Sequence, residues 1–98
     1  MTHHDEAVVT DRLRRALLAF QSAQDLLLNA HRRLKALPQA EVEAFWNDRG
    51  RRVEANMRLT ATEVVTAFKA FSAAGLVAAA SDRHLVTQAH RYLAEEAA

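Results

Sequence analysis

Apolar residues recur along the first third of the chain with the period of a packed helix. Four large ones stand seven positions apart: Leu13, Phe20, Leu27 and Leu34. Alanine or leucine follows each of them by three positions, which places both sets on one face of a helix. The pattern predicts a helix over about residues 5–37 with an apolar seam. Pro38 ends it, because the residue before a proline avoids the α region.

A second apolar seam, with alternating steps of four and three, follows in the next third of the chain. Its members are Val53, Met57, Ala61, Val64, Phe68, Phe71, Gly75 and Ala78. The seam predicts a helix over about residues 49–80 that folds back antiparallel on the first. In this register Leu34 lies opposite Val53, and Phe20 lies opposite Phe68. The two seams would close a helical hairpin or a dimer.

Residues 38–48 are predicted to form the turn of this hairpin. Asn47 and Asp48 are good capping residues beside Gly50, and all three are poor in a helix interior, which favours a break here. The alternative is that the second helix begins at Pro38 and runs straight through.

A further helical segment is expected over residues 82–96. Its apolar stripe consists of Leu85, Val86, Ala89, Tyr92 and Leu93. Asp82 falls where the second seam calls for an apolar residue, and a buried unpaired carboxylate would cost several kcal/mol. Either the seam is open to water here, or Ser81 or Asp82 caps the new helix. The pattern leaves open whether the segment folds back or projects.

Composition favours one all-α domain over residues 1–98. Half of the residues are hydrophobic, and there are only two glycines and one proline. A chain this short buries a limited core, so we expect a partner or a second copy to complete a four-helix bundle. The absence of cysteine excludes disulfides and thiol chemistry.

Residues suited to catalysis or metal binding are sparse. No two of the five histidines have the i, i+4 spacing of a metal site on one helix face. Glu41 and Glu43 point to different helix faces, so they are a poor acid/base pair. No phosphate-binding glycine motif is present. The sequence therefore predicts a protein that is not an enzyme and has no cofactor or metal.

Charge and hydropathy limit the other kinds of partner. Seven of the thirteen basic residues are expected at the turn end: Arg32, Arg33, Lys35, Arg49, Arg51, Arg52 and Arg58. Acidic residues are interleaved with them and the formal charge is +1, so a nucleic-acid or anionic-surface binder is less favoured. No apolar run approaches the ~20 residues of a membrane span. The start of the chain has no signal-peptide pattern.

Two short motifs give the chain a resemblance to a known family. Trp46 is the only tryptophan and lies in the expected turn, and Tyr92 precedes Glu96 in a Tyr-x-x-x-Glu motif near the C-terminus. With two helices in about a hundred residues, the chain resembles the WXG superfamily of type VII secretion substrates (ESAT-like proteins). The resemblance implies a homo- or heterodimer, exported from the cytoplasm without a cleaved signal peptide. It also implies that Trp46 of one subunit and Tyr92 and Glu96 of the other form a signal read by a secretion ATPase.

The turn departs from the family pattern at one position. Asp48 stands where the family has glycine, and Gly50 comes two residues later. Related hairpins with Trp-x-Asp turns include partners of larger toxins, so Asp48 and Gly50 join the candidate recognition residues. The alternative function is a cytoplasmic chaperone or adaptor that binds a client helix on the stripe of residues 85–93.

Overall fold

The protein is all-helical over residues 3–97, which are the residues that the computed structural model describes. The elements are α1 (His3–Ala36), α2 (Gln39–Phe45), the π-helical turn η1 (Trp46–Gly50), α3 (Arg51–Ala73) and α4 (Ala80–Ala97). No strand occurs in this range. The predicted all-α fold is therefore confirmed.

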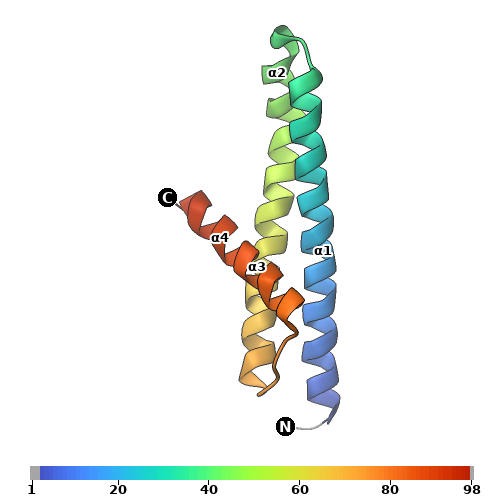
Figure 1. The fold of residues 1–98 in the computed structure, drawn as a ribbon, viewed down its shortest axis with the longest axis vertical. Helices are drawn as coiled ribbons and strands as arrows, with labels where there is room; N and C mark the ends of the chain where they lie inside the picture. Colours follow the sequence, from blue (N-terminus) through green and yellow to red (C-terminus); the bar gives the residue numbers. More distant parts are fainter. Residues whose placement is uncertain (1–2, 98) are drawn as a thin grey trace.

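The predicted turn over residues 38–48 is wrong, and so is the favoured break at Asn47 and Asp48. The chain reverses at Leu37 and Pro38, and α2, η1 and α3 follow as one helical rod (Figure 1). Both junctions of η1 have right-handed helical dihedral angles, and no side chain caps α3. The weak helix formers at 47–50 are accommodated within a π-helical turn, where the Arg51 N–H donates to the Trp46 carbonyl.

Helices α1 and α3 lie side by side and run in opposite directions (Figure 1). Three contacts fix their register: Arg12 pairs with Glu63, His31 stacks on Trp46, and the Arg33 guanidinium lies over the Phe45 ring. The midpoint in sequence between the two members of each pair lies near residue 38. In the predicted register this midpoint lay about six residues later, so the expected pairing of Leu34 with Val53 and of Phe20 with Phe68 is wrong.

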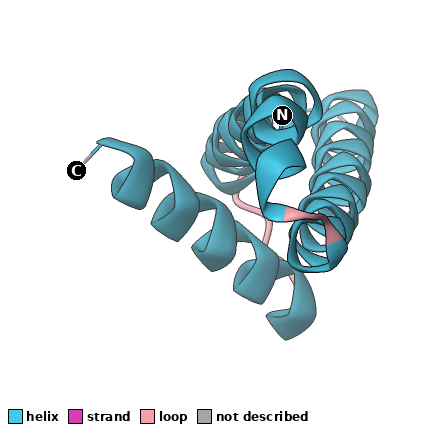
Figure 2. Cartoon of the chain, turned by 90° about the horizontal axis from the view of Figure 1, so that it is seen from above, coloured by secondary structure: helices cyan, strands magenta, loops and turns pink. Residues whose placement is uncertain are grey.

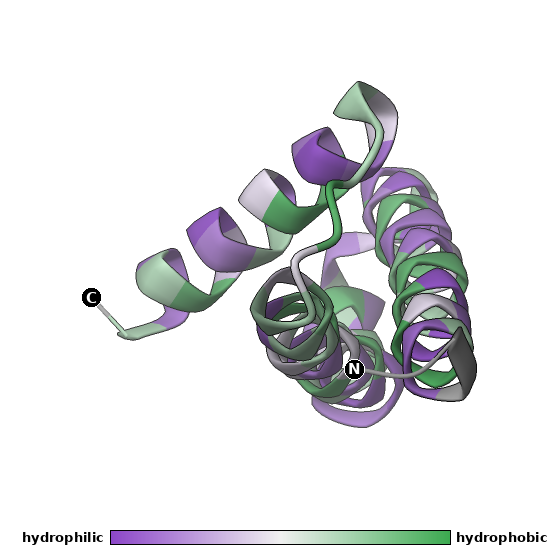
Figure 3. Ribbon diagram, turned by 90° about the horizontal axis from the view of Figure 1, so that it is seen from below, coloured by the Kyte–Doolittle hydropathy of each residue, from purple (hydrophilic) through white to green (hydrophobic). Residues whose placement is uncertain are grey.

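The core follows the two seams. Phe20 and Val64 are the largest side chains that are completely buried, and the small residues Ala23, Ala61 and Ala67 are completely buried as well. Each helix carries hydrophobic and hydrophilic residues on different sides (Figure 3). Removing these apolar side chains from water is what holds α1 against α3, because long helices gain most of their stability from packing.

Helix α3 ends at Ala73 rather than near residue 80. Gly75 has a φ of +80°, a left-handed conformation that glycine adopts without steric cost. The Gly75 N–H donates to the Ser72 carbonyl and the Leu76 N–H to the Phe71 carbonyl, which together form a Schellman motif. Gly75 is therefore a helix stop and not a member of the apolar seam.

Helix α4 folds back across one side of the α1–α3 pair (Figures 1 and 2). Val86 and Ala89 are buried there, and Leu85, Tyr92 and Leu93 pack around them. Neither Ser81 nor Asp82 caps the helix, because α4 begins at Ala80, two residues before the predicted start. The half-buried Asp82 lies in its first turn, where a carboxylate is favourable.

The molecule is elongated. Its principal extents are 57 × 24 × 21 Å, and its radius of gyration is 16.2 Å, against about 13 Å for a compact domain of this length. Within residues 3–97, no helix combines the length and the apolar character needed to cross a membrane.

Candidate functional site

Tyr92 joins α4 to α3 through its hydroxyl group. The oxygen lies 3.3 Å from the Glu54 carbonyl and 3.1 Å from Oε1 of Glu96, so its proton can be donated to either. The other Glu96 oxygen accepts a hydrogen bond of 2.9 Å from Nε of Arg58. Burial, followed by the hydrogen bond to Glu96, raises the pKa of Tyr92 to about 12.

Trp46 is held by residues on both sides of the chain reversal. Its ring system and that of His31 on α1 are stacked, with centroids 5.9 Å apart and an interplanar angle of 13°. Gly50 lies one helical turn after Trp46, and a Cβ atom there would clash with the indole. The indole therefore occupies space that only glycine leaves open at position 50.

These two clusters meet at one pocket of about 200 Å³, which we call the Trp46 pocket. It is lined by Leu27, His31, Trp46, Glu54, Tyr92 and Glu96. The lining residues come from α1, η1, α3 and α4, so the fold of a single chain assembles it. Three of the five candidate recognition residues, Trp46, Tyr92 and Glu96, are thus brought together.

The other two candidate residues lie differently. Asp48 is exposed and forms an ion pair of 2.9 Å with Arg52, one turn along the helix, and it does not line the pocket. Gly50 is buried and acts through its contact with Trp46.

Nine seam residues that are larger than alanine divide by burial. Leu13, Phe20, Met57, Val64 and Phe71 are buried. Leu27, Leu34, Val53 and Phe68 are half-buried.

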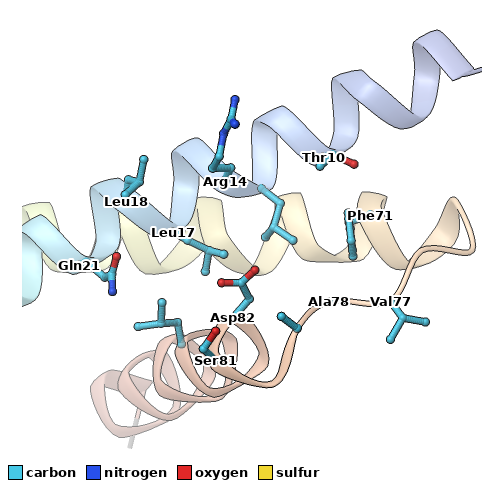
Figure 4. A pocket seen from close by; sticks show the side chains of 13 residues that line it. Thr10, Arg14, Leu17, Leu18, Gln21, Phe71, Val77, Ala78, Ser81 and Asp82 are labelled. Atoms are coloured by element: carbon cyan, nitrogen blue, oxygen red, sulfur yellow. The ribbon is translucent and has the colours of Figure 1, made fainter.

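A second groove, of about 370 Å³, lies between α1 and the start of α4 (Figure 4). Its walls include the exposed side chains of Leu18 and Val77, and the Asp82 carboxylate points from α4 toward α1. The groove shares no lining residue with the Trp46 pocket.

The basic residues do not gather at the turn end as expected. Because the chain reverses at Pro38, Arg49, Arg51 and Arg52 lie about three helical turns away from the reversal. Arg52 and Arg58 are paired with carboxylates. No group of three metal-ligating side chains was found in the part of the chain that the structure describes.

Sequence reasoning missed two lining residues, His31 and Glu54. His31 is fifteen positions from Trp46, and only the correct register brings the rings together. Glu54 lies four positions before Arg58, as in many ion pairs on the surface of a helix. No sequence signal distinguishes Glu54 from an acidic residue that is exposed to solvent.

Comparison of the chain with protein-family models, with curated proteins and with solved structures gives no match. The chain's own residues therefore carry the functional argument.

Proposed function

We propose that this protein is a small, non-enzymatic recognition partner of the type VII secretion kind, in line with its resemblance to the WXG superfamily. It would act by binding other proteins, as a substrate or co-secreted partner. It would be cytoplasmic before export and leave the cell without a cleaved signal peptide. A secretion ATPase or a larger toxin is the partner that the resemblance implies.

The observation that carries this proposal is the convergence of Trp46, Tyr92 and Glu96 on one pocket. Trp46 lies almost fifty positions from Tyr92 and Glu96 in the sequence, yet all three residues line the same pocket. The resemblance implies that the two halves of the signal come from different subunits. In this protein Trp46, Tyr92 and Glu96 of the same chain line one pocket, which supports the proposal that a single chain presents the complete surface.

Association into a four-helix bundle remains part of the proposal. Leu26 and Leu59 are 51% and 72% exposed, which leaves apolar surface for a second helical pair on a homo- or heterodimer. Light scattering across a dilution series measures this directly. A mass of two chains supports a homodimer. A mass of one chain indicates that the second helical pair of the bundle comes from another protein.

The test of function is export of Trp46→Ala from the host. We expect the variant to keep its helicity, because Trp46 is only half-buried, and to lose export or partner binding. Val8→Ala, which also shortens an exposed apolar side chain, is the matched control and should be exported normally. Normal export of folded Trp46→Ala would refute the proposal.

The adaptor alternative requires an open stripe on α4. That stripe packs against α1 and α3, with Ala89 fully buried, so a client helix would first have to displace α4. No observation favours this function over the first.

A further inference from the structure

The chemistry of the Trp46 pocket restricts what it can bind. It is lined by the apolar residue Leu27, by the aromatic residues His31, Trp46 and Tyr92, and by the acidic residues Glu54 and Glu96. Aromatic walls combined with carboxylates suit a cation that carries an apolar or planar body.

The two carboxylates differ in what already binds them. Glu96 accepts hydrogen bonds from both Arg58 and Tyr92, and its side chain is 27% exposed. The carboxylate of Glu54 is on a half-buried residue and forms no ion pair or hydrogen bond with any other residue in the range 3–97. The backbone carbonyl of Glu54, in contrast, accepts a hydrogen bond from the Tyr92 hydroxyl.

A ligand in this pocket must therefore neutralise the Glu54 carboxylate and donate hydrogen bonds to it. An anion would be repelled by the unpaired carboxylate of Glu54, and a purely apolar group would remove water from Glu54 without replacing its hydrogen bonds. A guanidinium or ammonium group would pair with Glu54 while its stem lies along Leu27 and the aromatic rings.

We propose that the Trp46 pocket receives an arginine or lysine side chain presented by a partner protein. The inference rests on the proposed function, because it specifies the partner chemistry that the recognition surface selects. Glu54 is the residue that pairs with the incoming charge, and Trp46 and Tyr92 enclose its stem.

Trp46 is the only tryptophan in the chain, so its fluorescence reports occupancy of the pocket directly. The probe is the capped peptide Ala-Ala-Arg-Ala-Ala, titrated into the full chain beside the same peptide with citrulline, which keeps the shape and loses the charge. We expect saturable binding of the arginine peptide only. Glu54→Gln should weaken it by about tenfold, since a hydrogen bond to a charged group is lost.

Asp25→Asn is the matched control, because it removes one negative charge from an exposed position on α1 and should leave binding unchanged. Equal binding of the citrulline peptide, no saturable binding, or unchanged affinity in Glu54→Gln would each overturn the inference. The binding measurement needs only the purified chain. Arginine binding with normal export of Trp46→Ala would therefore refute the proposed function and leave the cation site standing.

Discussion

The contact between Gly50 and Trp46 shows how one residue shapes the candidate site. The indole lies against the helix backbone one turn away, and a Cβ atom at position 50 would meet three of its ring atoms within 2.9 Å. Glycine in a helix interior costs about 1 kcal/mol relative to alanine. At position 50 this cost is offset, because the absence of a side chain leaves room for the Trp46 indole, which would otherwise have to move.

We predict that Gly50→Ala destabilises the protein despite its better helix propensity. Overpacking typically costs roughly 1–3 kcal/mol, which outweighs the gain of about 1 kcal/mol from propensity. Urea unfolding measures the difference. In a Trp46→Leu background the clash is removed, and the same substitution should become stabilising. A stabilising effect with Trp46 present would show that the contact is not tight.

Tyr92 gives a prediction for the dependence of stability on pH. Its pKa is about 12 in the folded chain and ~10 in an unfolded one, so folding favours the protonated phenol. Its stabilising contribution is therefore complete below about pH 10 and is lost as the pH rises toward 12. Because Tyr92 is the only tyrosine, tyrosinate absorbance reports it alone. A folded-state midpoint near 10 would contradict the buried hydrogen bond.

At the scale of helices, the sequence predicted which residues turn inward but not how the helices align. The seven-residue repeat on α1 identifies its inner face correctly, since Leu13 and Phe20 are buried. Register depends on where the chain reverses. Two good capping residues, Asn47 and Asp48, favoured a late turn, but packing of the whole rod outweighs these local preferences.

The candidate site was predictable only where its residues are neighbours on the same helix. Tyr92 and Glu96 lie one helical turn apart, so their proximity follows from the sequence. The positions of His31 and Glu54 beside them depend on the register of α1 and on the docking of α4, and neither was available from residue patterns. The helix stop at Gly75 was missed, because Gly75 was assigned to the apolar seam of a helix over residues 49–80, although glycine after an apolar helix is a common terminator.

Docking of α4 builds one wall of the Trp46 pocket, and we predict that Ala89→Arg releases it. Ala89 is completely buried, so a long charged side chain cannot remain in its place. The pKa of Tyr92 should then fall from about 12 toward ~10. Circular dichroism should show that most of the helix is retained.

Thr87→Arg places the same side chain on an exposed position of α4 and is the control. The pKa of Tyr92 should stay near 12 in that variant. An unshifted pKa in Ala89→Arg would mean that the Tyr92 environment does not depend on the docked helix.

At the scale of the whole molecule, the protein exposes more surface than its size requires. Its accessible area is 6670 Å², against about 5600 Å² for a compact monomer of this mass. The excess follows from the long α1–α3 pair, which α4 covers on one side only (Figure 2). Such a shape suits a protein whose work is to present side chains to partners.

We propose that one chain presents the complete recognition surface. The most direct test is export from cells that produce Trp46→Ala and Tyr92→Ala together. If each chain must carry both residues, the two variants cannot complement each other, and we predict no export of either. If the signal were formed between subunits, mixed dimers would contain one intact surface. Export restored by co-production would show that the recognition surface forms between two subunits and not on a single chain.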